Sequence, residues 1–271
     1  MANRINYQKP PIGVQLNTNH PLGQGVVGYW LLDEMGGGIA YDISGRNVNA
    51  TLTNGPVYNN DGLNFDGTND YAKAGVRSTV QGFPFTLCGW VRSTSTDTAY
   101  RTILGIGSDT VNRGWFTIQV RARTATAMRF GMTADNNDLS GGTDDYQDLT
   151  DYSSSCWHFV AAVFASATDR RLYVDGRLLA SRTGSVTFNT AITTGSTYIG
   201  ARDLRGAPAA NTYLLGQAKN LRIYNRALTK NEIAELYVNP YSGILMPMRR
   251  NINQQPAGAS IYTKANYFLS F

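Results

Sequence analysis

Short runs of alternating apolar and polar residues follow one another along most of the chain and predict β-strands. Segments such as FTLCGWVR, WFTIQVRA and WHFVAAVF are rich in Val, Ile, Phe, Trp and Thr, and Gly, Asn, Asp or Ser separates them. Roughly a dozen such runs recur without a helical pattern between them, which favours antiparallel pairing. The pattern therefore predicts an all-β fold, an antiparallel two-sheet sandwich.

The sharpest local signal is a hairpin. The dipeptide Asp175-Gly176 lies between two apolar runs, 172–174 and 177–181. A two-residue turn of this kind needs positive φ at both positions, which Asp and Gly tolerate. The sequence therefore predicts a type I′ β-hairpin at this point.

One helix is predicted near the end of the strand-rich region, over residues 230–238. Thr229 is its expected N-cap, and Glu232 lies at the capping-box spacing three residues later. Leu228 and Ile233 flank the cap at the positions of a hydrophobic staple, and an Asn-Pro pair then stops the helix.

Composition divides the chain of 271 residues into three zones. Residues 1–25 and 240–271 are polar and rich in Pro and Asn and predict an N-terminal and a C-terminal arm, whereas 26–239 predict one domain. Of the formal charge of +5, the first arm carries +2 and the last carries +3, so the domain is neutral. The excess of basic residues therefore indicates that the arms bind an acidic surface of a partner, and it does not indicate a polyanion site on the domain.

Reactive side chains are few. His20 and His158 are the two histidines, and Cys88 and Cys156 are the two cysteines, which excludes multi-histidine and four-cysteine metal sites within one chain. We expect both cysteines to be buried free thiols, with a disulfide as the alternative, and His158 to be packed or hydrogen-bonded. The strand-like runs hold no glutamate, which leaves only aspartates from distant loops for glycoside hydrolysis. We expect no enzyme activity.

Calcium is the metal ion that the loops suit best, because Asp and Asn supply the oxygen ligands that it prefers. Two loops carry the candidate ligands, which are Asp42, Asn47 and Asn49 in the first and Asp66, Asn69 and Asp70 in the second. The alternative is that these residues form Asx-turns without an ion. The acidic stretch 135–151 lacks the EF-hand spacing and is read as a solvated loop.

Carbohydrate binding would use exposed aromatic rings that stack on sugar faces, with Asn and Asp as hydrogen-bond partners. The candidates in loops are Tyr100, Tyr146 and Tyr152. The four tryptophans lie in strand-like runs, and we expect them in the core or between the sheets; they are Trp30, Trp90, Trp115 and Trp157.

Short motifs follow one order along the middle zone: GYW at 28–30, DISG at 42–45, LNFDG at 63–67, WHFVA at 157–161, LYVDG at 172–176 and IYNRALT at 223–229. Together they resemble the laminin G-like, concanavalin A-like jelly-roll domains. The lead-in NHPL at 19–22 and the exit NPY at 239–241 are similar to laminin G-like proteins encoded by tailed bacteriophages. The resemblance implies a virion structural protein, such as a capsid decoration, head-fibre or tail-associated protein. The alternative is an adhesion module that binds host glycans, with or without calcium.

The arms are the expected means of attachment to capsid or sister subunits. The terminal run IYTKANYFLSF alternates in the way that suits strand addition to a neighbour, and a disordered tail is the alternative. The candidate contact residues are Arg249, Arg250, Tyr262, Tyr267, Phe268 and Phe271. We expect a homo-oligomer located in the virion, with neither a secretory signal nor a membrane span, since the longest apolar run covers only 159–165. Nucleic acid is not an expected partner, because basic residues form no run longer than a pair.

Overall fold

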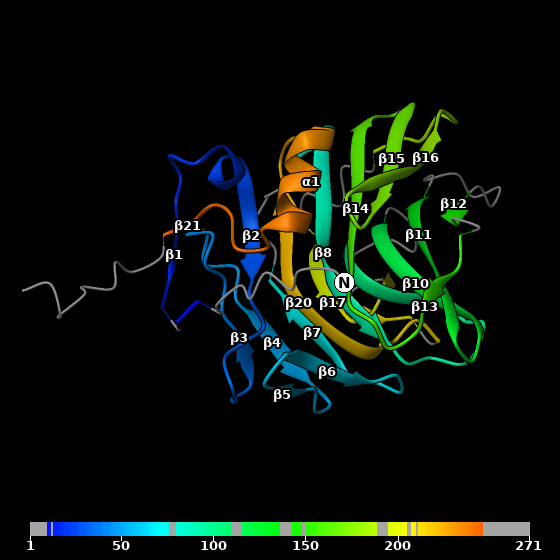
Figure 1. Ribbon diagram of the computed structural model, residues 1–271, viewed down its shortest axis with the longest axis horizontal. Helices are drawn as coiled ribbons and strands as arrows, with labels where there is room; N and C mark the ends of the chain where they lie inside the picture. The colour runs from blue at the N-terminus through cyan, green and yellow to red at the C-terminus, as the bar shows by residue number, and fades with distance from the viewer. Residues whose placement is uncertain are drawn as a thin grey trace, which may run out of the picture.

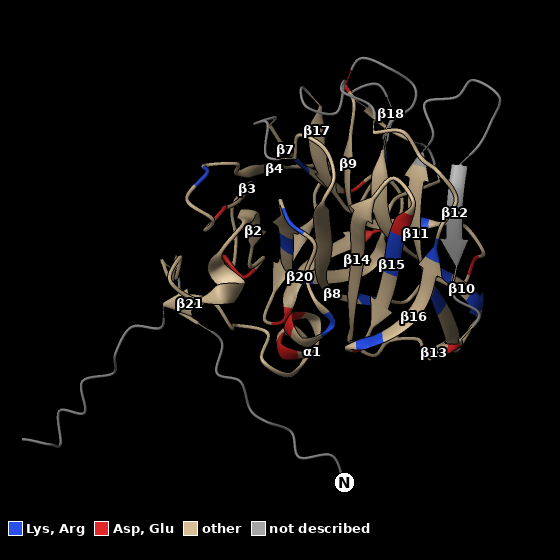
Figure 2. Ribbon diagram, turned by 90° about the horizontal axis from the view of Figure 1, so that it is seen from above, with Lys and Arg blue, Asp and Glu red and all other residues tan. Residues whose placement is uncertain are grey.

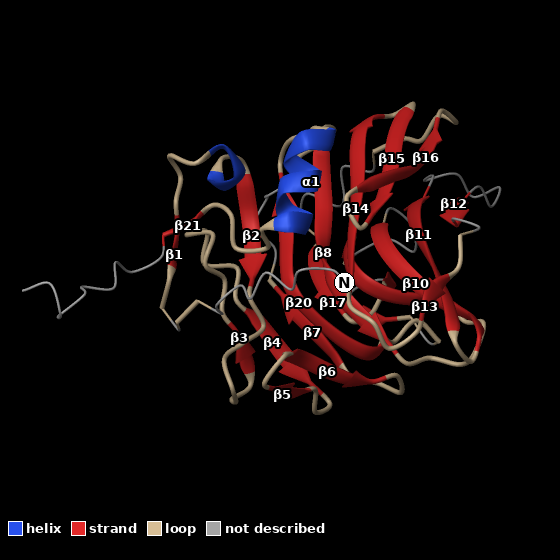
Figure 3. Ribbon diagram, viewed as in Figure 1, coloured by secondary structure: helices blue, strands red, loops and turns tan. Residues whose placement is uncertain are grey.

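Two antiparallel β-sheets face each other and make up most of the protein (Figures 1 and 3). The computed structural model describes residues 10–11, 13–75, 80–109, 115–135, 143–147, 150–188, 195–204, 207–209 and 211–245. The predicted all-β sandwich is confirmed within these residues.

The first sheet has eight strands. Seven of them follow the order β16 (Arg177–Arg182), β15 (Asp169–Val174), β14 (His158–Ser166), β8 (Phe85–Ser93), β20 (Leu215–Tyr224), β6 (Gly62–Asp66) and β5 (Val57–Asn59). The eighth strand, β2 (Val26–Trp30), also pairs with β20. Because β6 and β2 pair with different halves of β20, two short strands share one side of a long one.

The second sheet has nine strands. Eight follow the order β12 (Thr143–Gln147), β11 (Ala127–Asp135), β10 (Phe116–Thr124), β9 (Arg101–Gly107), β17 (Ser196–Ile199), β7 (Tyr71–Ala74), β4 (Ala50–Thr53) and β3 (Ile39–Ala40). The ninth, β13 (Tyr152–Ser153), pairs with β11. Two small ladders complete the fold, one of β1 (Gln15–Leu16) with β21 (Ile244–Leu245) and one of β18 (Asp203–Leu204) with β19 (Ala207–Pro208).

The main core fills the space between the two sheets. Its centre is aromatic: Phe85 stacks on Phe164 at a centroid distance of 4.7 Å, and Phe116 meets both rings edge-on at 5.1 Å. All three rings are fully buried, so burial of apolar surface between the sheets is the main stabilising contribution.

A second apolar cluster lies on the opposite face of the eight-stranded sheet. There α1 (Lys230–Val238) packs Ile233 and Leu236 against the sheet, with Phe159 and Tyr173 among the strand residues that it covers. Figure 1 shows the helix lying across β20 and β8. The predicted capping box is confirmed, because the Thr229 hydroxyl accepts from the Glu232 amide and the Glu232 carboxylate accepts from the Thr229 amide.

The predicted hairpin joins β15 to β16. Asp175 has a φ of 49° and Gly176 a φ of 77°, so both turn residues occupy the left-handed region that a type I′ turn requires. The Asp175 side chain also accepts hydrogen bonds from the Phe159 amide and meets His158, whose other ring nitrogen contacts the carbonyl of Ser153. The expectation of a hydrogen-bonded His158 is confirmed.

Parts of both segments expected as arms pack onto the domain. A 3-10 turn (Pro21–Gly23) buries Leu22, and β1 and β21 pair so that Gln15 lies opposite Leu245. The packed part of the chain therefore begins before residue 26 and extends past residue 239. The six candidate contact residues of the C-terminal arm, from Arg249 to Phe271, lie outside the described residues.

The two cysteines are free, but only one is buried. Cys88 lies within β8 and is fully buried, as expected. Cys156 is exposed, and the expectation of burial was wrong there because the residue belongs to the turn before β14 instead of the strand.

Lys, Arg, Asp and Glu are scattered over both sheets (Figure 2). The described residues contain no helix of the length and hydrophobicity needed to cross a bilayer.

Candidate functional site

A gap beside β20 creates the candidate site. β6 pairs with β20 as far as Ala218, and β2 begins to pair with it at Leu221, so neither short strand pairs with Lys219 or Asn220. Asn220 has a φ of 52°, a conformation that Asn tolerates better than most residues, and its amide donates to the carbonyl of Leu31. The strand therefore bulges where its neighbours change over.

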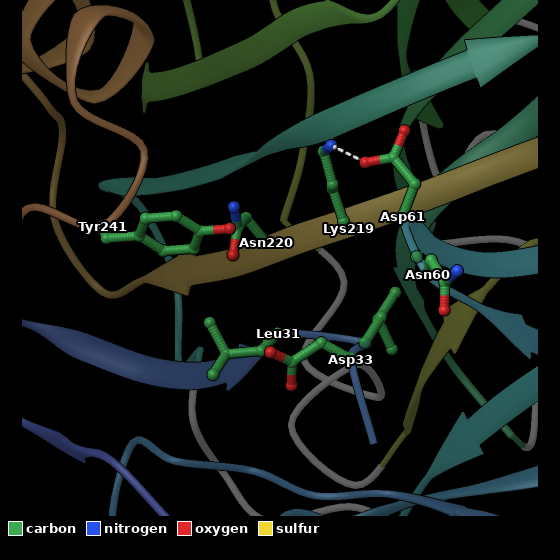
Figure 4. A pocket seen from close by; sticks show the side chains of 9 residues that line it. Leu31, Asp33, Asn60, Asp61, Lys219, Asn220 and Tyr241 are labelled. Carbon is green, nitrogen blue, oxygen red and sulfur yellow. Dashed lines mark hydrogen bonds and ion pairs between the residues drawn. The ribbon is translucent and has the colours of Figure 1, made fainter. Parts of the chain in front are cut away.

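A polar pocket of about 160 Å³ occupies this gap (Figure 4). Four segments far apart in the sequence supply its walls: the end of β2, the turn between β5 and β6, the bulge of β20 and the chain after α1. The lining residues are Leu31, Leu32, Asp33, Asn60, Asp61, Gly62, Lys219, Asn220 and Tyr241. Two carboxylates, two amides, an ammonium and a phenol thus meet in one small cavity.

Asp61 is the most strongly engaged acid of the pocket. Its Oδ1 pairs with Lys219 Nζ at 2.5 Å, and its Oδ2 accepts from the indole Nε1 of Trp157 at 2.6 Å. Burial alone would raise the pKa of Asp61, but these two hydrogen bonds and the Lys219 charge outweigh it and hold the pKa below its usual range. Asp61 is therefore an ionised acceptor in neutral solution.

Trp157 does not line the pocket, but it contacts two residues that do, Asp61 and Lys219. Lys219 Nζ lies 4.0 Å from the indole centroid, and the Arg92 guanidinium lies 5.3 Å from it. Arg92 is in turn hydrogen-bonded to the side chain of Gln217 on β20. The half-buried indole lies outside the inter-sheet core, so the expectation of core packing was wrong for this tryptophan.

Tyr241 closes the other end of the pocket. Its hydroxyl points toward the side chain of Asn220 (Figure 4). Burial raises the pKa of Tyr241 to about 12, against the opposing effect of the nearby Asn220 side chain. The phenol is therefore neutral in ordinary solution and remains both a donor and an acceptor for a ligand.

The first predicted calcium loop does come together, with Asp42 at its centre. Its carboxylate accepts four hydrogen bonds of 2.7–3.1 Å, from the amides of Tyr29, Ser44 and Val48 and from the Ser44 hydroxyl. The Asn49 side chain accepts from the Asp42 amide and donates to the side chain of Asn47. These bonds are those of the Asx-turn alternative, and calcium binding there stays a prediction.

The second predicted loop has the same character. Asp66 Oδ1 accepts from the amides of Thr68 and Asn69, and Asp70 Oδ2 accepts from the Asp66 amide. Among the residues that the structure describes, no three His, Cys, Asp or Glu side chains gather as a metal-binding group. Calcium at Asp66, Asn69 and Asp70 also stays a prediction.

Two of the three tyrosines predicted to bind carbohydrate have described side chains, and these two lie in different surroundings. Tyr100 is 36% exposed, and Arg121 lies over its ring at 5.1 Å and donates to its hydroxyl. Tyr152 packs against Phe130 and the main core. Tyr146 is on β12, and its side chain lies outside the described part of the chain.

Sequence patterns missed the pocket almost entirely. Asp33, Asp61 and Lys219 are separated by up to 186 positions, so no local spacing links them. The nearest available signal was the NNDG turn at 59–62, which places two polar side chains at the tip of a hairpin.

Comparison with solved structures supports the fold. The chain is similar to a Trypanosoma rangeli sialidase in complex with sialic acid, with 21% identity and a TM-score of 0.57 over 80% of this chain and 33% of that one. It is also similar to the botulinum neurotoxin serotype D binding domain, with 15% identity and a TM-score of 0.55 over 80% of this chain and 52% of that one. The chain thus spans between a third and a half of these proteins, and the likeness concerns the fold alone.

Comparison with curated protein sequences gave no match. A family profile described as the concanavalin A-like lectin/glucanases superfamily, of laminin G type, matches residues 66–234. This match covers more than half of the chain and most of both sheets. The predicted laminin G-like jelly roll is therefore confirmed, and the chain belongs to the concanavalin A-like lectin/glucanase superfamily.

Proposed function

We propose that this protein is a carbohydrate-binding module whose ligand occupies the pocket beside β20. The supporting observation is that Asn60, Asp61, Lys219, Asn220 and Tyr241 converge on one cavity. A small concave site with several convergent polar groups is the usual form of a small-ligand site. A lectin-like fold is consistent with a sugar as that ligand.

The side chains match the hydroxyl groups of a sugar. Each hydroxyl both donates and accepts, and the pocket offers acceptors in Asp61, donors in Lys219, and groups of both kinds in the two amides. Trp157 adds an indole that contacts Asp61 and Lys219 and holds both side chains beside the pocket. The pocket has room for about one sugar ring, so a terminal or branch residue is the expected ligand.

We infer binding without turnover. A glycosidase needs a carboxylic acid whose pKa is raised so that it protonates the leaving oxygen. The pKa of Asp61 is shifted the opposite way by Lys219 and Trp157, so Asp61 does not meet this requirement and only Asp33 among the lining residues is left for it. Incubation with a polysaccharide panel should therefore release no reducing sugar; sustained release would contradict this inference.

Replacing Asp61 with asparagine should weaken glycan binding by about tenfold or more, the loss of roughly 1.4 kcal/mol in binding free energy. The variant keeps the shape of the side chain but loses the charge that orients Lys219 and the indole of Trp157. A glycan array would first identify a ligand for the full chain, and titration calorimetry would then compare affinities.

Asp151→Asn is the matched control for this comparison. Asp151 also accepts from two cationic side chains, Arg123 and Arg129, but it lies away from the pocket. The Asp151→Asn variant should bind the glycan with the same affinity as the wild type. Equal affinities for Asp61→Asn and the wild type would place the ligand elsewhere.

Repeating the glycan array with EDTA tests the predicted role of calcium. If calcium takes part in glycan binding, binding should be lost when EDTA removes the ion.

A second candidate function is a structural role in a bacteriophage virion, with the lectin-like domain displayed on the particle and the arms attached to capsid proteins. The pairing of β1 with β21 favours it, because Gln15 and Leu245 lie opposite each other and bring the two ends of the packed chain together. The two arms together carry the whole net charge of the chain. They would act as one basic anchor on an acidic particle surface.

Deletion of residues 246–271 should abolish attachment to particles while leaving glycan binding intact. The deletion removes Arg249, Arg250 and the alternating apolar end but none of the residues that line the pocket. Co-sedimentation of the protein with particles measures attachment. Unchanged occupancy after the deletion would contradict anchoring by this arm.

A further inference from the structure

The chain has two histidines, and the partners of their ring nitrogens differ. His20 Nδ1 accepts a hydrogen bond from the Leu22 amide at 3.1 Å, so an unprotonated nitrogen fits its surroundings. Both ring nitrogens of His158 face oxygen acceptors: Nδ1 lies 2.8 Å from Asp175 Oδ2, and Nε2 lies 3.1 Å from the carbonyl oxygen of Ser153. A neutral imidazole has a single N–H donor, whereas the imidazolium has two. The surroundings of His158 therefore match the protonated ring.

The ring of His158 is enclosed by several elements. Its side chain is 11% exposed, and the rings of Phe130 on β11 and Tyr152 on β13 pack on it at centroid distances of 5.5 Å and 5.3 Å. Asp175, in the turn between β15 and β16, supplies the negative charge beside it. Burial and then the charge of Asp175 raise the pKa of Tyr237 on α1. Phenols stay neutral in neutral solution, so the proton on His158 is the one that changes there.

The contact with Ser153 closes the turn that carries Trp157. Ser153 ends β13 and His158 begins β14, so the Nε2 contact joins the two ends of segment 154–157. Ser155 within this segment has a φ of 65°, in a region that few non-glycine residues adopt. The turn is therefore one that needs its closing contacts, and loss of the Nε2 contact would loosen the position of Trp157.

Trp157 connects this turn to the pocket beside β20. Its Nε1 donates to Asp61 Oδ2 at 2.6 Å, and Lys219 Nζ lies 4.0 Å from its indole centroid. Asp61 and Lys219 both line the pocket, and none of the nine lining residues is a histidine. Asp61 stays ionised and Tyr241 stays neutral near neutral pH, since the pKa of each is shifted away from that range. A histidine outside the lining is thus placed to make the pocket sensitive to pH.

We propose that His158 is a positioning residue of this pocket, and that its protonated form keeps Asp61 and Lys219 in place for a glycan. The inference rests on the function proposed above, because it concerns the same pocket. The imidazolium donates to both Asp175 and Ser153 and so fixes the turn that carries the indole. Loss of the proton leaves a nitrogen lone pair facing one of these oxygens, and that contact opens. Glycan affinity should therefore be high in mildly acidic solution and fall as the pH rises through the titration of His158.

The test measures the affinity of the full chain for a neutral glycan, chosen from the array so that the ligand itself does not titrate. Titration calorimetry over roughly pH 5 to 8 should show a fall in affinity of at least about threefold. NMR signals of the two histidine rings follow their protonation under the same conditions. The midpoint of the affinity change should coincide with the midpoint of His158 and not depend on that of His20.

Three variants separate positioning from a merely structural role. Asp175→Asn keeps a residue that tolerates the positive φ of this turn but removes the charge that favours the protonated ring, so the NMR and binding midpoints should both move to lower pH. His158→Gln should weaken binding in acid and abolish the pH dependence. His20→Asn is the matched control, since it keeps an N-cap acceptor for the Leu22 amide, and it should retain the wild-type profile.

The outcomes distinguish failure of this inference from failure of the proposed function. A glycan whose affinity depends on Asp61 but not on pH would overturn the role of His158 and leave the proposed function standing. A binding midpoint that does not move with the NMR midpoint of His158 in Asp175→Asn would do the same. Absence of binding to every glycan at every pH would overturn both.

Discussion

Arg222→Ala is expected to lower the free energy of unfolding by about 3–5 kcal/mol, because it leaves a buried cavity and leaves several buried polar groups without a hydrogen-bond partner. Arg222 is 2% exposed on β20, beneath the chain that follows α1. Its guanidinium lies 4.2 Å from the Tyr29 ring centroid and donates to the Tyr29 hydroxyl and to the carbonyl of Pro240. No carboxylate takes part in these contacts.

This arginine is held as a cation by aromatic and neutral groups. Burial lowers the pKa of Arg222, but Tyr29 and Tyr224 outweigh burial and raise the pKa above its usual value. Removal of the side chain leaves the Tyr29 hydroxyl and the Pro240 carbonyl without their donor in a dry environment, and it leaves a cavity as well. The loss should loosen the packing of the C-terminal segment on the sheet.

Guanidinium unfolding of matched variants measures the effect. Arg226→Ala is the comparison, since Arg226 also lies over a tyrosine ring and donates to the carbonyls of Pro21 and Gln24 but is partly exposed, and its loss should cost less than that of Arg222. Arg222→Met retains most of the volume and should fall between the two. A cost below about 1 kcal/mol for Arg222→Ala would contradict the role assigned to this side chain.

Asp42→Ala is expected to cost about 2–4 kcal/mol, because one carboxylate satisfies three backbone amides and a hydroxyl. One of those amides belongs to Tyr29 in β2, so the loop that starts at Asp42 is tied to the eight-stranded sheet. Thermal or urea unfolding at neutral pH gives the value. Asp66→Ala is the comparison, since that carboxylate supports the amides of a local turn within one loop and its loss should cost less.

The same unfolding measurement, made with added calcium and then with EDTA, separates the calcium-binding and Asx-turn interpretations of this loop. Calcium bound only to the folded state would raise the unfolding midpoint, and EDTA would lower it again. An unchanged midpoint would leave Asp42 as a hydrogen-bonding centre without an ion. An Asp42→Ala variant as stable as the wild type would contradict both interpretations.

Local patterns in the sequence predicted the elements well, because their causes are local. The Asp175-Gly176 turn and the Thr229 cap depend on φ angles and hydrogen bonds within a few residues. Alternation of apolar residues predicted the sandwich for the same reason, since each strand must bury one face. The motifs that resemble laminin G-like domains then identified the family.

The candidate site could not be predicted in this way, because it arises from strand order. Lys219 and Asn220 line a pocket because β6 ends and β2 begins at that point of β20. Trp157 lies in a strand-like run, yet it precedes β14 by one residue and lies at the edge of the packed core. Asp42 shows the converse case, in which a residue type suited to a metal is used to hold a loop.

The contrast between the two thiols makes the protein convenient to observe. Burial raises the pKa of Cys88 to about 12, which keeps that thiol protonated and unreactive, whereas Cys156 is exposed. A maleimide dye would therefore attach at a single position, one residue from Trp157, which contacts the pocket residues Asp61 and Lys219. Indole quenching of that dye would report occupancy of the pocket in real time, without an engineered label site.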